Sequence, residues 1–256
     1  MVRCAGVSGL VGALQFLTRV PIRSRTAIAH DRVVPWFPIA GVLIGAVVGG
    51  VAAGLSELVP PLVVGAVAVA VGLLVTGAFH EDGLADVADA FGGGWTVERR
   101  LEILKDSRHG TYGVAALSTS VVIRVAAAAS ITGPAALFAS FVAAHTLGRA
   151  AAVVAMRAAP PATQSGLGVS AAAALRPAPT AIGIATGTAV VAVLTGWWVV
   201  AFVAAAAVGT GLTVRLAVRK IGGLAGDVLG AVEQVVECLV LVVASGLAMR
   251  SDLWWT

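Results

Sequence analysis

Seven long apolar stretches dominate the sequence and leave little of the chain for anything other than a membrane protein. A helix needs about 20 predominantly apolar residues to cross the hydrocarbon core of a bilayer. Stretches of about this length lie at residues 35–57, 60–79, 111–132, 134–156, 180–196, 197–214 and 228–249. Charged residues make up only 12% of the 256, about half the share found in soluble domains. We therefore predict an all-α, polytopic helical bundle of about seven transmembrane helices, with residues 1–256 forming a single membrane-embedded domain.

Two junctions in this plan carry further information. The fifth and sixth stretches meet at Trp197 and Trp198, an aromatic pair typical of a membrane interface. A tight turn at this pair is our interpretation, and a single broken helix is the alternative. The N-terminal segment VSGLVGALQFLTRVPIRSR lacks a small-residue cleavage site. We interpret it as a retained amphipathic or re-entrant helix.

Cys4 and Cys238 show no metal-ligand spacing and predict no disulfide framework.

The positions of the basic residues predict an orientation. If the stretches alternate sides, fourteen basic residues fall on one side of the membrane and only Arg250 falls on the other. The fourteen are Arg3, Arg19, Arg23, Arg25, Arg32, Arg99, Arg100, Lys105, Arg108, Arg157, Arg176, Arg215, Arg219 and Lys220. Lys and Arg mark the cytoplasmic side. We expect a cytoplasmic N-terminus and an external C-terminus, and the net charge of +4 requires no nucleic acid.

Acidic residues gather at one point of the chain, in the segment FHEDGLADVADAFGGG. Seven of the thirteen Asp and Glu residues fall between 81 and 106. On a helix, Asp82, Asp86 and Asp89 lie at roughly 0°, 40° and 340°, and therefore share one face. Like charges at these spacings destabilise a helix unless they are neutralised. A divalent cation such as Mg²⁺ suits a few carboxylates together with substrate phosphate oxygens. The alternative is a solvated acidic helix end.

A second helix and a polar loop follow this cluster. Three glycines end the first helix, and Thr96 can cap a new one whose apolar stripe predicts a short helix on the cytoplasmic surface. That helix leads to Lys105, Asp106, Ser107 and Arg108, ahead of HGTYG. Arg and Lys suit phosphate oxygens, and an Asp suits a metal. We therefore place an active-site loop at about residues 80–112, with a loop of self-paired charges as the alternative.

A second polar cluster occupies about residues 221–237, where glycines precede Asp227 and the last apolar stretch. Helix geometry places Glu233 about 9 Å and Glu237 about 15 Å deeper than Asp227. Arg149 and Arg124 lie at similar depths, about 12 Å and 16 Å inside their own stretches. Charges inside a span are costly unless they are paired. We therefore predict the ion pairs Glu233–Arg149 and Glu237–Arg124, with a structural or a catalytic role.

Three blocks of the sequence resemble the signature blocks of the cobalamin synthase family, the adenosylcobinamide-GDP ribazoletransferases. The blocks are FHEDGLADVADAFGG, ERRLEILKDSRHGTYG and IGGLAGDVLGAVEQVVE, and the segments FLTRVPI and WFPIAGVLIG are also similar to that family. The resemblance extends from about residue 14 to residue 240. This sequence departs from the family's usual pattern at Ala90, where Gly is common, at His109, where an apolar residue is common, and at Ala225, where Thr is usual.

The resemblance implies a bacterial plasma (inner) membrane enzyme, a Mg²⁺-dependent phosphotransferase. It would join adenosylcobinamide-GDP to α-ribazole or its 5′-phosphate, form adenosylcobalamin or its 5′-phosphate, and release GMP. The implied metal ligands are Asp82, Asp86, Asp89, Asp106 and Asp227. The implied catalytic residues are His80, Glu81 and Asp82, with His80 or Glu81 as base, and the implied phosphate contacts are Lys105, Ser107 and Arg108. His80 could instead be a metal ligand or an interfacial hydrogen-bonding residue.

Two other functions fit part of the sequence. A CDP-alcohol phosphotransferase uses related chemistry, but its D-x-x-D-G-x-x-A-R pattern is missing, because Ala90 follows Asp89. A transporter could use the embedded acids and arginines, but the chain shows no internal repeat. Partners implied by the main interpretation are the two substrates and the lipid bilayer, with a homo-oligomer or a complex with other corrin-pathway enzymes as further possibilities.

Overall fold

The computed structural model describes residues 2–22, 30–163, 173 and 175–255, and these ranges contain helices and turns but no β-strand. The basic residues Arg23 and Arg25, used above to predict the orientation, lie outside the described residues. The elements are α1 (Val2–Leu17), α2 (His30–Val33), the 3₁₀ turn η1 (Val34–Trp36), α3 (Phe37–Leu55), α4 (Pro61–Thr76), α5 (Phe79–Gly93), α6 (Val97–Ile103), α7 (Thr111–Ala129), α8 (Pro134–Ala158), α10 (Pro177–Thr195), α11 (Trp198–Ile221) and α12 (Gly226–Ala248).

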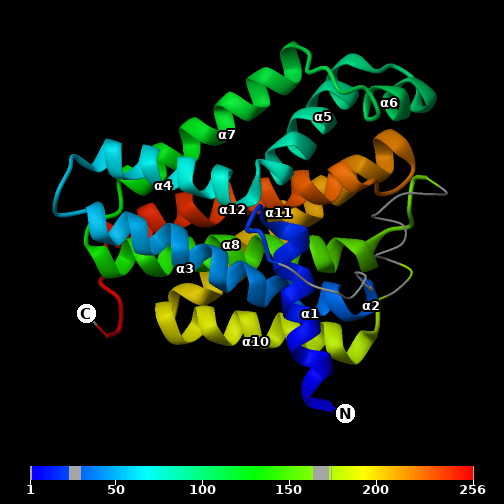
Figure 1. The fold of residues 1–256 in the computed structure, drawn as a ribbon. Coiled ribbons are helices and arrows are strands. Elements are labelled where there is room, and N and C mark those ends of the chain that lie inside the picture. Colours follow the sequence, from blue (N-terminus) through cyan, green and yellow to red (C-terminus); the bar gives the residue numbers. More distant parts are fainter. Residues whose placement is uncertain (1, 23–29, 164–172, 174, 256) are drawn as a thin grey trace.

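The predicted polytopic helical bundle is confirmed. Among the described residues, six helices are long and apolar enough to cross a membrane, or up to seven if the bent pair α4 and α5 counts as one span. The turn predicted at the tryptophan pair is also confirmed. Helix α10 ends at Thr195, Gly196 has a φ of +58°, and α11 begins at Trp198. The N-terminal helix is present as α1, which packs against α2, η1 and α3 and runs crosswise to the bundle (Figure 1).

The second predicted span differs from the expectation, because the helix ends at Thr76 rather than at residue 79. Gly77 and Ala78 both have left-handed backbone conformations, with φ of +68° and +56°. Two such residues in succession redirect the chain, and α5 leaves α4 at an angle of 92°. Sixteen residues give α4 a length of about 24 Å, which is short for a full crossing. The sharp bend gives the acidic helix a direction of its own.

Helix α8 forms the centre of the bundle and contacts α3, α10, α11 and α12. Its contact with α3 is close because Gly41, Gly45 and Gly49 follow one another at four-residue intervals on α3. A Cβ atom at Gly45 would lie 2.6 Å from Cα of Val142, and one at Gly49 would lie 2.8 Å from the carbonyl oxygen of Phe138. Small residues at this spacing let membrane helices approach backbone to backbone.

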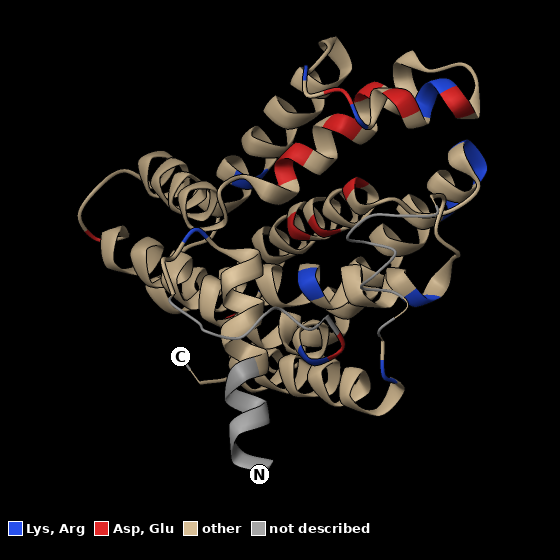
Figure 2. Cartoon of the chain, turned by 45° about the vertical axis from the view of Figure 1, so that its right-hand side comes forward, with Lys and Arg blue, Asp and Glu red and all other residues tan. Residues whose placement is uncertain are grey.

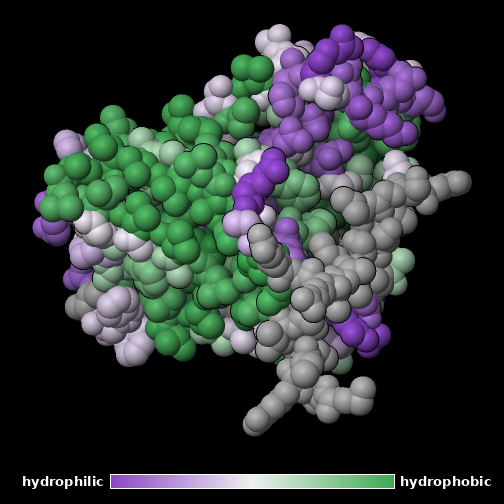
Figure 3. Space-filling view, viewed as in Figure 1, coloured by the Kyte–Doolittle hydropathy of each residue, from purple (hydrophilic) through white to green (hydrophobic). Residues whose placement is uncertain are grey.

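Charge and apolar surface separate along the molecule. Helices α5 and α7 pack against each other and against α12, and α6 follows the far end of α5 (Figure 1). Lys, Arg, Asp and Glu concentrate on α5, α6 and the adjoining loop (Figure 2), and the hydrophilic surface in Figure 3 lies over the same region. The predicted short helix is present as α6, and its predicted N-cap is confirmed, because the Thr96 hydroxyl accepts the backbone N–H of Arg99 at 3.2 Å. The fold thus places the exposed polar groups of α5, α6 and their loop at one end.

Candidate functional site

Helix α5 presents acids on two different faces. Residues 80 and 81 point into the bundle, with His80 5% and Glu81 3% exposed. The side chain of Asp82, the next residue, is 64% exposed. Successive helical residues are about 100° apart, so Asp82 lies about 200° from His80 and falls outside the buried face. The three residues predicted to be catalytic are therefore divided between a buried cluster and an open one.

The open cluster consists of Asp82, Asp86 and His109. His109 precedes α7, and its imidazole lies between the two aspartates of α5. Its Nε2 is 3.4 Å from Oδ1 of Asp82, and its Nδ1 is 3.4 Å from Oδ1 of Asp86. One ligand atom from each residue falls within 4.8 Å of the other two. Two carboxylates and an imidazole at this spacing form a donor set that fits a divalent cation.

Asp89 lies on the same helix face but has a different arrangement. Its carboxylate is only 8% exposed and accepts the backbone N–H of Gly110 at 2.6 Å and that of Gly113 at 2.9 Å. Each oxygen thus has a donor from the segment where α7 begins. Asp89 fixes the start of α7, and with it the loop that carries His109. In this arrangement its oxygens are engaged with backbone groups and do not join the open cluster.

The loop after α6 holds Asp106 in a pair with Arg108. The Arg108 side chain donates from Nε at 3.0 Å and from Nη2 at 2.8 Å, and its backbone N–H donates at 3.1 Å. These hydrogen bonds lower the pKa of Asp106 to about 2. Lys105 and Ser107 are exposed beside this pair. The structure therefore brings the predicted phosphate contacts to one loop, while Asp106 contacts Arg108 rather than the open cluster.

Asp227 begins α12 and lies at the edge of the open cluster. Its backbone packs on Gly83, where an added Cβ would be 2.7 Å from the Asp227 carbonyl oxygen. The Asp227 carboxylate is partly exposed and is repelled electrostatically by Asp82, and it acts in the same way on Asp86. Gly83 thus lets the start of α12, with Asp227, pack directly against the acidic helix α5. Three negative charges meet there, which increases the benefit of a bound cation.

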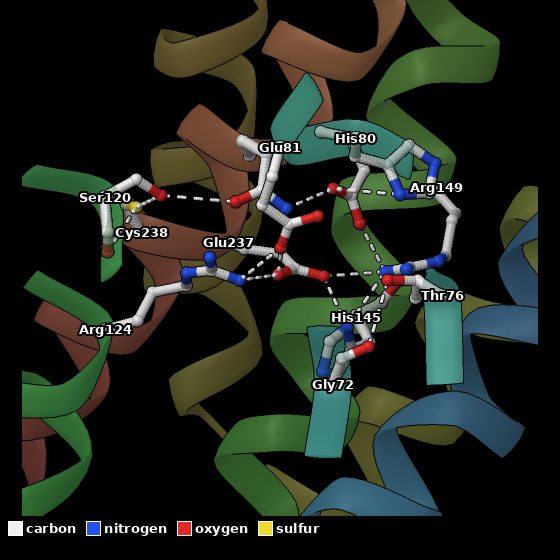
Figure 4. A network of polar contacts seen from close by, with 12 residues as sticks. Gly72, Thr76, His80, Glu81, Ser120, Arg124, His145, Arg149, Glu237 and Cys238 are labelled. Carbon is white, nitrogen blue, oxygen red and sulfur yellow. Dashed lines mark hydrogen bonds and ion pairs between the residues drawn. The ribbon is translucent and has the colours of Figure 1, made fainter. Parts of the chain in front are cut away.

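The buried cluster lies between α4, α5, α7, α8 and α12 (Figure 4). Both predicted ion pairs are confirmed: Arg149 pairs with Glu233, and Arg124 pairs with Glu237 at 3.3 Å. Arg149 also reaches Glu237, at 2.7 Å between Nη1 and Oε1. A pair that the sequence did not predict joins Arg124 to Glu81, at 2.9 Å. The cluster therefore ties the first turn of α5 to α7, α8 and α12.

Two histidines complete the buried cluster. His145 pairs with Glu237, and Nδ1 of His80 lies 3.6 Å from Oε2 of Glu233. The side chains of the two glutamates are 2% exposed or less, so this cluster is closed to solvent. His80 and Glu81, predicted as candidate bases, are placed here. His109, which had no assigned role, lies in the open cluster. No local sequence signal could show that His109, and not His80 or Glu81, lies in the open cluster, since each contact joins segments distant in the sequence.

The fold and the site define a polytopic membrane protein with an open cluster of carboxylates at one end of the bundle and a closed cluster of ion pairs in its interior. Residues 9–245 match the family model described as cobalamin-5-phosphate synthase, and the chain belongs to this family.

Curated relatives agree along nearly the full length. The chain is similar to the adenosylcobinamide-GDP ribazoletransferase of Bradyrhizobium diazoefficiens, at 40% identity over 93% of each chain. Proteins of the same name are similar at 38% identity in Ralstonia nicotianae, over 90% of this chain and 91% of the relative, and at 32% identity in Vibrio cholerae, over 90% of each chain. No solved structure matches. The family match favours the transferase over the two alternative functions considered from the sequence.

Proposed function

We propose that this protein joins adenosylcobinamide-GDP to α-ribazole, or to α-ribazole 5′-phosphate, and releases GMP. The product is adenosylcobalamin or its 5′-phosphate, at the end of cobalamin biosynthesis. The observation that carries the proposal is the family match over residues 9–245, which includes all three blocks that contain the acidic and basic groups of the site. The relatives are named adenosylcobinamide-GDP ribazoletransferase, which supports the same substrate.

The donor set supports a Mg²⁺ requirement. Asp82 and Asp86 are close enough to share a cation and have Asp227 beside them, so they would hold it. Bound there, Mg²⁺ would neutralise phosphate charge and favour departure of the GMP phosphate. Asp89 supports the site indirectly, because it fixes the loop opposite these carboxylates.

The reaction needs a proton acceptor and groups that hold the phosphates. A ribazole hydroxyl forms a bond to the phosphorus on the cobinamide side while the bond from that phosphorus to GMP breaks. Of His80, Glu81 and Asp82, only Asp82 is exposed, and we assign it as the acceptor of the hydroxyl proton. Lys105 and Arg108 lie on the exposed loop that leads to His109, and we assign them contacts with phosphate oxygens. Ser107 provides a further hydrogen-bond donor on the same loop.

The location of the site agrees with the distribution of charge. The end of the bundle that carries α5, α6 and their loop holds basic residues of α6 and of the last turn of α11, where Arg100 donates to the Lys220 carbonyl oxygen. We assign this end to the cytoplasm of a bacterial cell, the protein to the inner membrane, and the C-terminus to the outside. Homo-oligomers and complexes with other corrin-pathway enzymes remain predictions.

The test measures GMP release by purified protein in detergent or liposomes. Adenosylcobinamide-GDP, α-ribazole and Mg²⁺ are supplied together and then omitted one at a time. Release by the wild type should require all three components. Asp82→Asn should abolish release, whereas Glu102→Gln, a matched change on exposed α6, should keep it. Absence of release from folded wild-type protein under every metal would overturn the proposal.

A further inference from the structure

The imidazole of His109 lies between two carboxylates at distances longer than those of close hydrogen bonds. Its two ring nitrogens are each 3.4 Å from a carboxylate oxygen, one on Asp82 and one on Asp86. Hydrogen bonds from nitrogen to oxygen fall mostly between 2.7 and 3.2 Å. The imidazole thus sits near both carboxylates without forming a close bond to either.

The distance from either ring nitrogen to its own carboxylate oxygen matches that between two ligands of one cation, and only one of the two nitrogens would bind that cation. Ligand atoms bound about 2.1 Å from a metal, at tetrahedral or octahedral angles, are about 3.0–3.4 Å apart. One ring nitrogen of His109 and one oxygen from each of the two aspartates lie within 4.8 Å of one another. A cation among them would need only small side-chain adjustments.

The backbone around His109 is held independently of any cation. The next residue, Gly110, donates its N–H to Asp89, which stands one turn after Asp86 on α5. The loop that carries the imidazole is therefore fixed to the helix that carries the carboxylates. Gly113, at the start of α7, donates to the same carboxylate. Preorganised ligands of this kind bind a metal without first ordering a loop.

We propose that His109 is a third ligand of the cation held by Asp82 and Asp86, and that it widens metal use at this site to Mn²⁺ and Co²⁺. The inference rests on the proposed function, because it concerns the cation of that reaction. An all-carboxylate site suits Mg²⁺, whereas an imidazole nitrogen increases the affinity for later divalent metals. His109 is a binding residue here and takes no part in proton transfer.

The test uses Mn²⁺ as a spectroscopic probe of tag-free protein in detergent. Pulsed electron paramagnetic resonance of the Mn²⁺-loaded wild type should show a coupling to ¹⁴N that changes to a ¹⁵N coupling when histidine is ¹⁵N-labelled. His109→Leu should remove that coupling and weaken Mn²⁺ binding on the order of tenfold, with a much smaller effect on Mg²⁺. Asp86→Asn should remove Mn²⁺ binding from the site. Thermal unfolding confirms that each variant is folded.

Three results would overturn the inference: a wild-type spectrum without histidine coupling, an unchanged Mn²⁺ affinity in His109→Leu, or Mn²⁺ binding that survives Asp86→Asn. Release of GMP by the wild type with Mg²⁺, measured in parallel, separates this inference from the proposed function. Release without nitrogen coupling rejects only the ligand role of His109. Nitrogen coupling without release under any metal retains the site and rejects the proposed reaction.

Discussion

The open cluster and the buried cluster contain similar residues but have different roles. In the buried cluster, Arg124 and Arg149 each contact two carboxylates, and solvent is excluded. In the open cluster no arginine is paired with Asp82 or Asp86 among the described residues, and only His109 stands between them. Charges that the chain neutralises itself hold helices together. Charges that it leaves uncompensated at an accessible end are available to a ligand.

The largest effect should come from breaking the buried cluster. Replacing Arg149 by Met leaves Glu233 and Glu237 without their shared partner in a closed interior. Removal of one member of a buried ion pair typically costs about 3–5 kcal/mol. We expect a large loss of folded protein and a lower unfolding midpoint in detergent. Arg99→Ala serves as the control, because Arg99 pairs with Glu102 on the exposed surface of α6. Equal stability of the two variants would contradict a structural role for the buried cluster.

Breaking the open cluster should affect the reaction and leave the fold intact. Asp86→Asn keeps the size of the side chain and removes one of the converging charges. We expect GMP release to fall by about 100-fold or more, as when a principal electrostatic group of a catalytic site is lost. The unfolding midpoint should stay the same or rise, since repulsion from Asp82 is relieved. A lower midpoint together with normal activity would assign Asp86 to the structure instead.

Glu81→Gln sharpens the comparison, because Glu81 is adjacent to Asp82 in sequence but belongs to the buried cluster. The change weakens its ion pair with Arg124, at a cost of about 1.5–3 kcal/mol for a charged hydrogen bond. We expect a lower unfolding midpoint, with the folded fraction keeping most of its activity. Full stability with lost activity would instead support the sequence-based assignment of Glu81 as a base. Glu102→Gln provides the exposed control.

The smallest expected effect concerns the loop that carries the open cluster's histidine. An alanine Cβ at Gly113 would crowd the Asp89 carboxylate and lie 2.9 Å from the Ala85 carbonyl oxygen. A misplaced loop should reduce metal affinity and activity severalfold, and overpacking of this kind costs about 1–3 kcal/mol. Metal titration and thermal unfolding measure the two effects. Gly93→Ala is the control, because nothing lies within 4 Å of its added Cβ.

Much of the fold could be predicted because it follows from properties of single helices. The lengths of the apolar stretches predicted the membrane-spanning helices, and Thr96 predicted the start of α6. The two ion pairs were found because depth along a helix follows from residue count, and opposite charges inside a membrane tend to pair with one another. The break after Thr76 was missed, since Ala78 gives no signal of its left-handed conformation.

The candidate site could be predicted only in part. The sequence placed Asp82 and Asp86 on one helix face, and the structure keeps them together with His109. It could not show that Asp89 is occupied by backbone groups or that Asp106 pairs with Arg108. Those outcomes depend on where the loop before α7 returns to α5. Each requires the position of one segment relative to another.

The sequence by itself determined a helical membrane protein, its family and the residues from which a site can be made. Only the tertiary structure decided that Glu81 faces Arg124 in the interior while Asp82 faces solvent, and that His109 joins the open cluster. The reason is physical. Length, periodicity and capping act within one helix, whereas the direction in which a side chain points relative to its surroundings is set by the packing of neighbouring helices.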